Sequence, residues 1–261
     1  ELNYICISNI FKLRYFIEFA YNGTNYHGWQ LQPAAITVQK VLTDCLTTLF
    51  REPIDLVAAG RTDAGVHAKK MYAHFDTEKD IHHQEWIQKI NSFLPEDITV
   101  FRIFRVHDDA HARFDAIART YEYHLHTFKN SFLKNLSWYH FRPLDIDAMN
   151  KAAQILLEYD DFECFSKTHT DVFTYQCKIS SANWSVTGNQ MVFTITANRF
   201  LRNMVRAIVG TLIQVGLHKI AIADIRKIIE SKNRSQAGFS VPAHGLYLTE
   251  VQYPYITNEK I

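Results

Sequence analysis

One carboxylate in this chain stands in a setting suited to covalent chemistry. Asp63 lies between Gly60 and Gly65, in the segment Ala-Ala-Gly-Arg-Thr-Asp-Ala-Gly-Val-His-Ala that covers residues 58–68. Glycine permits unusual backbone angles and the close approach of a ligand, and the alanines leave room for a bulky substrate. A carboxylate in such a loop can act as a nucleophile or can stabilise developing charge. The alternative is an Asp that caps the following turn, which is common for a single Asp in a glycine-rich loop.

An aromatic side chain could act with this carboxylate. On the strand expected over 117–126, Tyr121 shares the more apolar face with Tyr123 and Leu125. Its ring could stack on a planar ligand there. Without other information, an ordinary core tyrosine is the more common outcome on such a face.

A basic side chain is expected to pair with Asp63. On the helix expected over 201–216, Arg206 lies where a basic stripe containing Arg202 runs into buried surface. A partly buried guanidinium needs an anionic partner, so we hypothesise an ion pair between Arg206 and Asp63. A phosphate-binding or solvated arginine is the alternative, and it remains natural for Arg202 and Arg199.

The segment His107-Asp108-Asp109-Ala110-His111 has a spacing that suits metal ligands, and a His-Asp pair can serve a metal-dependent phosphohydrolase. No second His or Asp cluster has a comparable pattern. Because a motif this short is unspecific, we treat the metal site as a minor alternative and expect no metal and no organic cofactor.

The hydrophobic pattern predicts the elements that must position these residues. We expect strands over 13–21, 54–59, 71–75, 98–107, 117–126, 171–186, 190–198 and 246–253, and helices over 38–50, 84–93, 145–159, 201–216 and 221–231. Strands and helices are mixed without strict alternation, which favours an α+β fold with an antiparallel sheet. Each half begins with a strand and a helix, which suggests two similar lobes. We divide the chain into an N-terminal extension (1–11), a lobe with the Asp63 loop (12–112) and a lobe with Tyr121 and Arg206 (113–261).

Composition limits the class of protein. The 261 residues are 47% hydrophobic and carry a formal net charge of +1, from 28 Lys and Arg against 27 Asp and Glu. These values exclude a disordered chain and a polybasic tail, but a local basic cleft for nucleic acid remains compatible with them. The four cysteines form no CxxC pair, and the apolar run 205–217 is too short to span a bilayer. No signal-peptide pattern opens the chain, so we expect a soluble, cytoplasmic protein.

An ordered series of segments resembles the tRNA pseudouridine synthase A family. The loop at 60–68 is similar to the family signature GRTDxGVHA at every defining position. Further similar segments are GWQLQ at 28–32, TVQ at 37–39, LPEDI at 94–98, HARF at 111–114, RTYEY at 119–123, MVRAIVG at 204–210 and GLYLTEVQY at 245–253. Departures fall at Asp115, where the family usually has a small residue, at 240–242 and at 201–203, and none of them touches the three residues singled out above.

The resemblance implies a pseudouridine synthase fold, with two lobes that share an antiparallel sheet flanked by helices and an active-site cleft between them. It implies isomerisation of uridine to pseudouridine at positions 38, 39 and 40 in the anticodon stem-loop of tRNA, by a homodimer. The target nucleotide must leave its stack, because the reacting atoms are not accessible inside a stem. A non-catalytic tRNA-binding protein of the same fold is the alternative from a second class.

Roles for single residues follow from the same resemblance. Asp63 becomes the nucleophile, and whether it attacks C1′, adds at C6 or first removes a ribose proton stays open. Tyr121 becomes a residue that stacks on the uracil and a candidate base at C5, and Arg206 becomes the partner of Asp63. The residues expected to bind substrate are Tyr121, Arg61, Thr62, His67, Arg113 and Arg202.

Overall fold

The computed structural model describes residues 12–81, 83–167 and 173–256, so the predicted N-terminal extension, residues 171–172 of one expected strand and the last five residues lie outside it. Nine strands of the described chain form one sheet. They are β1 (Leu13–Tyr21), β2 (Val57–Ala58), β3 (His67–Thr77), β4 (Ile98–Arg105), β5 (Ala118–His126), β6 (Trp138–Tyr139), β7 (Ile179–Thr187), β8 (Gln190–Ala197) and β9 (Leu246–Gln252). The main order is β4-β1-β3-β9-β5-β8-β7, with β2 beside β3 and β6 beside β5.

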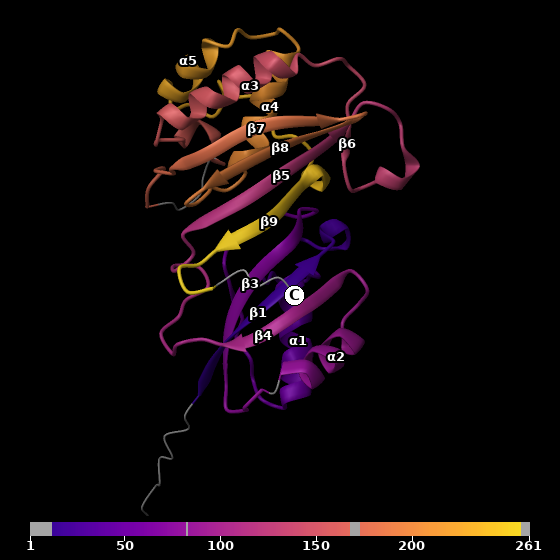
Figure 1. Ribbon diagram of the computed structural model, residues 1–261. Coiled ribbons are helices and arrows are strands. Elements are labelled where there is room, and N and C mark those ends of the chain that lie inside the picture. Colours follow the sequence, from indigo (N-terminus) through magenta and orange to yellow (C-terminus); the bar gives the residue numbers. More distant parts are fainter. Residues whose placement is uncertain (1–11, 82, 168–172, 257–261) are drawn as a thin grey trace, which may run out of the picture.

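Helices cover both halves of this sheet (Figure 1). Helices α1 (Val38–Phe50) and α2 (His83–Phe93) lie beside β1, β3 and β4, whereas α3 (Ile146–Ile155), α4 (Met204–Gly216) and α5 (Asp224–Glu230) lie by β5, β7 and β8. Buried apolar side chains form two clusters, one in each half. The α+β fold predicted from the sequence is confirmed. The boundary near residue 112 stays a prediction.

The halves of the sheet meet at β9. This last strand pairs antiparallel with β5 but parallel with β3, through His67 opposite Tyr247 and Ala68 opposite Leu248. The short pair of β5 and β6 is also parallel. The sheet is therefore mixed and mostly antiparallel, not wholly antiparallel as expected. A parallel pair needs a long crossover, and here most of the chain between residues 78 and 245 supplies it.

Several expected boundaries move for local reasons. Helix α4 begins at Met204 because Asn203 adopts a left-handed backbone (φ 67°). The strand expected over 54–59 shrinks to Val57–Ala58, and β3 begins at His67, before the expected residue 71. The helix expected over 145–159 ends at Ile155 and continues as a 3-10 turn. The earlier start of β3 matters most, because it places the end of the glycine-rich motif in a fixed strand.

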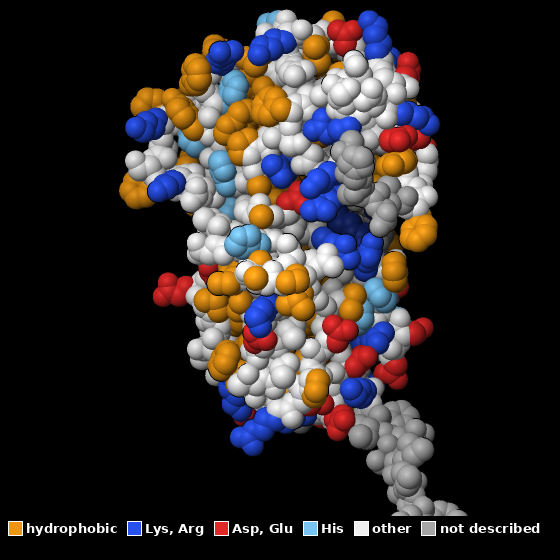
Figure 2. Space-filling view, turned by 180° about the vertical axis from the view of Figure 1, so that it is seen from behind, with side chains coloured by type: hydrophobic (Ala, Val, Ile, Leu, Met, Phe, Trp, Pro, Cys, Tyr) orange, Lys and Arg blue, Asp and Glu red, His pale blue; other side chains and the backbone are white. Residues whose placement is uncertain are grey.

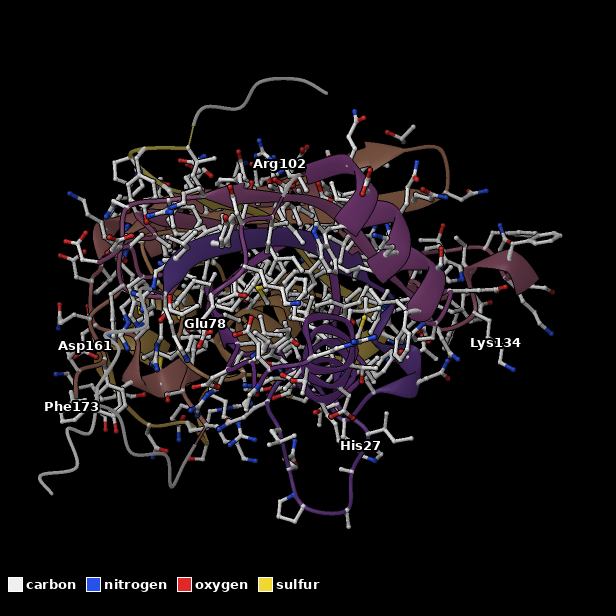
Figure 3. All side chains as sticks on the ribbon, turned by 90° about the horizontal axis from the view of Figure 1, so that it is seen from below. His27, Glu78, Arg102, Lys134, Asp161 and Phe173 are labelled. Carbon is white, nitrogen blue, oxygen red and sulfur yellow. The ribbon has the colours of Figure 1, made fainter. Side chains whose placement is uncertain are left out.

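The two faces of the sheet carry different side chains in the half formed by β1, β3 and β4. On one side, Arg102 Nε and the Tyr72 hydroxyl both donate to Glu18 Oε2 at 2.6 Å. His27 lies on the opposite side of the strands from Arg102 (Figure 3) and belongs to the segment that precedes α1.

No described helix is both long enough and apolar enough to cross a membrane.

A buried histidine supports the loop between β4 and β5. His74 on β3 is 6% exposed, and its Nδ1 accepts a hydrogen bond from the Ala112 backbone N–H at 3.1 Å. Burial lowers the pKa of His74 to about 4; the charges of Arg14 and His111 act in the same direction, and those of Asp76 and Asp115 oppose it. The folded protein therefore holds this imidazole neutral.

This neutral imidazole predicts a loss of stability in acid. Between pH 6.5 and pH 4 the unfolded chain binds a proton that folded His74 does not, so the free energy of unfolding falls as the pH falls through this window. We expect His74 to account for a loss of about 2 kcal/mol between pH 7 and pH 5. His74→Asn keeps a hydrogen-bond acceptor and removes the titration. Its free energy of unfolding should therefore fall by about 2 kcal/mol less between pH 7 and pH 5 than that of the wild type. Urea unfolding of both proteins at the two pH values measures the difference, and parallel losses would show that His74 does not contribute.

Candidate active site

The loop that carries Asp63 is held from the end of β1 and the segment after it. The Trp29 N–H donates to the Thr62 carbonyl at 3.2 Å, and the Thr62 hydroxyl bonds the Tyr21 hydroxyl at 2.8 Å. Gly28 has a φ of 87°, and a Cβ at this position would lie 2.4 Å from the Thr62 oxygen. The close approach of Gly28 therefore holds the backbone next to Asp63, and a Cβ at position 28 would prevent it.

The carboxylate of Asp63 faces two arginines from the other half of the chain. Arg206 Nη1 lies 3.3 Å from Asp63 Oδ2, and Arg202 Nε lies 3.6 Å from Asp63 Oδ1. Arg206 Nε also donates to the Val241 carbonyl at 2.7 Å. The hypothesised ion pair between Arg206 and Asp63 is present, with the Arg206 side chain only 19% exposed. The 58% exposed Arg202, for which the sequence favoured phosphate or solvent, contributes a second positive charge.

Turn capping does not account for Asp63. Its backbone carbonyl, not its side chain, accepts the hydrogen bond from the Val66 N–H at 3.1 Å. The carboxylate is thus left for Arg206 and for whatever enters the site. This arrangement joins the loop before β3 to helix α4, where the two halves of the sheet meet.

Tyr121 belongs to the same electrostatic environment. It lies on β5 opposite Leu248 of β9, and its ring meets Phe200 edge to face at 5.2 Å. Burial raises the pKa of Tyr121 to about 12; the positive charge of Arg119 lowers it and the negative charge of Asp63 raises it further. The ring is partly exposed. A neutral phenol next to Asp63 is therefore available for a planar ligand.

The predicted substrate residues divide into two groups. Arg61 and Arg113 are exposed, as contact with a ligand requires. The Thr62 hydroxyl is buried against Tyr21, and His67 is only 1% exposed. His67 Nδ1 accepts from the Gly23 N–H at 3.0 Å, so Nε2 carries the proton and donates to the His244 carbonyl at 3.1 Å. The geometry gives Thr62 and His67 internal partners and favours a positioning role for both.

Arg119 fastens the start of the Asp63 loop. From the sequence we did not include it among the site residues. Its guanidinium donates to four backbone carbonyls, those of Ala59, Arg113, Ala116 and Asn198, at 2.7–3.0 Å. Burial lowers the pKa of Arg119, and the nearby charges of Arg113 and Arg199 lower it further. The place of Arg119 in the RTYEY segment was the available signal, but that segment does not show which carbonyls Arg119 would reach.

Figure 2 shows Lys and Arg side chains gathered around an acidic side chain in the middle of one face.

The His107–His111 segment has local partners instead of a metal arrangement. His107 Nδ1 lies 2.6 Å from Asp109, and His111 Nδ1 accepts from two backbone N–H groups, of Arg113 and Phe114. Within residues 12–81, 83–167 and 173–256, no group of three His, Cys, Asp or Glu side chains is arranged to hold a metal ion. These contacts favour a structural role for the segment.

The Gly28 contact predicts a sharp cost for a small substitution. Gly28→Ala puts a methyl group against the Thr62 carbonyl and a side chain on a left-handed backbone, so we expect a loss of about 2 kcal/mol or more. Gly60→Ala is the matched control, because its Cβ would meet no atom within 4 Å, and it should stay within about 1 kcal/mol of wild type. Urea unfolding compares the two, and equal stabilities would contradict the fixed approach of position 28 to the loop.

Comparison with known proteins agrees with this site. The family model described as tRNA pseudouridine synthase matches residues 18–115 and 152–254, which include Asp63 and Arg206. Proteins named tRNA pseudouridine synthase A are 51% identical over 243 residues in Bacteroides fragilis, 52% over 246 in Porphyromonas gingivalis and 41% over 248 in Buchnera aphidicola. These matches cover 92%, 92% and 93% of this chain and 96%, 97% and 92% of the relatives. With Asp63, its two arginines and Tyr121 brought together in a fold that the family model spans on both halves, this chain belongs to the tRNA pseudouridine synthase family.

Proposed function

We propose that this protein isomerises uridine to pseudouridine at positions 38, 39 and 40 of the tRNA anticodon stem-loop, with Asp63 as the nucleophile. The observation that carries the proposal is the Asp63 carboxylate held between Arg206 and Arg202, in a chain of this family. The relatives named tRNA pseudouridine synthase A support tRNA as the substrate.

The reaction rearranges bonds without net oxidation. The N1–C1′ bond of uridine breaks, the base turns, C5 bonds to C1′, the proton on C5 leaves, and N1 takes up a proton, so that the product is an isomer of the substrate. Attack on C1′, addition at C6 and removal of a ribose proton each need a carboxylate whose position is fixed before the substrate arrives. Arg206 supplies that constraint, since its guanidinium is itself anchored on the Val241 carbonyl. The first step stays open among the three.

Tyr121 suits a stacking role in this reaction. With a pKa of about 12, its phenol keeps its proton at neutral pH, so removing the C5 proton would first require an unfavourable ionisation. The neutral ring can instead pack on the face of a flipped uracil, and its hydroxyl can donate a hydrogen bond. We therefore assign Tyr121 to holding the base while it turns.

Positive charge near the site supports a polyanionic substrate. Arg113 and Arg199 both act on the pKa of Arg119, and Arg202 reaches Asp63, so guanidinium groups from three segments converge here. They can neutralise phosphates around a flipped nucleotide despite a net charge of only +1. The homodimer implied by the family resemblance belongs to the same proposal, and so does the cytoplasmic location expected from the sequence.

Replacing Asp63 tests the assignment of the nucleophile. Asp63→Asn keeps the size of the side chain and removes the charge, so pseudouridine formation in unmodified tRNA should fall by at least about a thousandfold. Asp44→Asn is the control, because Asp44 is an exposed carboxylate that pairs with Lys40 on α1. Pseudouridine mapping of the tRNA, without added metal, reads out both the product and its position.

The outcomes separate the alternatives. Equal rates for wild type and Asp63→Asn would overturn the nucleophile, and product outside the anticodon arm would overturn the proposed target. If the wild-type protein binds tRNA and makes no product, the non-catalytic binding protein replaces the enzyme.

Shortening Arg206 tests its positioning role. Arg206→Lys keeps the positive charge, but an ammonium group cannot bond Asp63 and the Val241 carbonyl in the same fixed geometry. We expect kcat to fall about a hundredfold while tRNA affinity changes little. The control is Arg226→Lys on α5, which alters only an exposed pair with Glu158 and should leave kcat unchanged. A fall in tRNA affinity with an unchanged kcat would assign Arg206 to substrate binding instead.

A further inference from the structure

An aromatic side chain next to the Asp63 loop is exposed without an evident structural purpose. Phe114 lies in the loop between β4 and β5 and is 74% exposed. Its ring packs against the imidazole of His111 at 4.2 Å, with 36° between the planes, and the guanidinium of Arg113 lies 5.6 Å from its centre. An exposed ring that lies beside both an imidazole and a guanidinium offers a flat apolar face with a positive charge next to it, which suits a planar anionic ligand.

The backbone beneath this ring is fixed independently of the ring itself. His111 Nδ1 accepts from the N–H groups of Arg113 and Phe114 at 3.1 and 3.3 Å. The carboxylate of Asp115 accepts from the His111 N–H at 2.7 Å and from the Tyr255 hydroxyl at 2.8 Å. The backbone that carries Phe114 is thus fixed before any ligand binds, which reduces the entropic cost of binding.

The same loop is tied to the segment that leads to Asp63. Arg119 Nη2 donates both to the Arg113 carbonyl at 2.7 Å and to the Ala59 carbonyl at 3.0 Å. Ala59 is four residues before Asp63 in the same loop. A ligand on Phe114 therefore lies on a surface whose position is set relative to the candidate active site.

We propose that Phe114 and Arg113 form a stacking site for an unpaired nucleobase of the RNA, other than the uridine that reacts. A flat ring accepts any base by stacking, and the adjacent guanidinium can meet the neighbouring phosphate. The guanidinium of Arg113 beside the ring, with Arg119 bonded to the Arg113 carbonyl, favours a nucleic acid over an apolar protein surface as the occupant. The inference rests on the proposed function, because it assumes that an RNA loop reaches the Asp63 site.

The experiment measures RNA binding without turnover. In a protein carrying Asp63→Asn, the affinity for an anticodon stem-loop hairpin is compared for Phe114, Phe114→Ala, Phe114→Leu and Phe114→Trp. We expect Phe114→Ala to weaken binding about tenfold, the loss of one stacked base, Trp to restore it and Leu to fail to restore it. Phe132→Ala is the control, because Phe132 is 90% exposed in the 3-10 turn over Ser131–Leu133 and should not matter. A blunt RNA duplex without unpaired bases should bind Phe114 and Phe114→Ala proteins equally.

A spectroscopic signal separates stacking from general apolar contact. Hairpins with 2-aminopurine at single loop positions should show quenching at one position with Phe114, and that quenching should disappear with Phe114→Ala. Equal affinities for Phe114 and Phe114→Ala, full restoration by Leu, or a change confined to the oligomeric state would overturn the stacking site. The proposed function fails by a different result, the absence of pseudouridine in tRNA treated with the wild-type enzyme. Thermal unfolding of each variant checks its fold. If Phe114→Ala does not fold, the affinities of Phe114→Trp and Phe114→Leu still test the proposal.

Discussion

The ion pair between Asp63 and Arg206 links two segments that are 143 residues apart in sequence. A guanidinium that is mostly withdrawn from water is costly unless a negative charge and hydrogen-bond acceptors surround it. Arg206 meets this need with the Asp63 carboxylate on one side and the Val241 carbonyl on another. The carboxylate in turn gains a fixed position. The loop before β3, helix α4 and the segment at 241 must therefore keep one arrangement relative to each other.

The mixed sheet provides that arrangement. Because β9 pairs parallel with β3 and antiparallel with β5, only this one strand separates the end of the Asp63 loop from the strand that carries Tyr121. His67, the first residue of β3, bonds the Gly23 N–H and the His244 carbonyl and stacks on Tyr247 at 4.5 Å. These contacts join the two halves at the end of the Asp63 loop, so a shift of one half would disturb both Asp63 and Tyr121.

Charge around the site is local, and the net charge of the chain gives no indication of it. Arg119 is partly buried among carbonyls and holds the 113–116 loop, while Arg113 and Arg199 stand close enough to lower its pKa. At position 115 the family resemblance led us to expect a small residue, and Asp115 here bonds both the His111 N–H and the Tyr255 hydroxyl. This departure fastens the loop that presents Phe114, and it leaves the Asp63 pair unchanged.

The sequence alone determined the chemistry-bearing residues and most of the elements. The motif around Asp63 and the series of family segments identified the carboxylate, and helical spacing led to Arg206 as its partner, since periodicity and local backbone preference are encoded within short windows. Only the tertiary structure decided the parallel junction of β9, the burial of Thr62 and His67, the four carbonyl contacts of Arg119 and the exposure of Phe114. These features depend on which distant segments meet, and a backbone carbonyl such as that of Val241 carries no signal in its residue type. Long-range packing sets them, and no single stretch of sequence contains it.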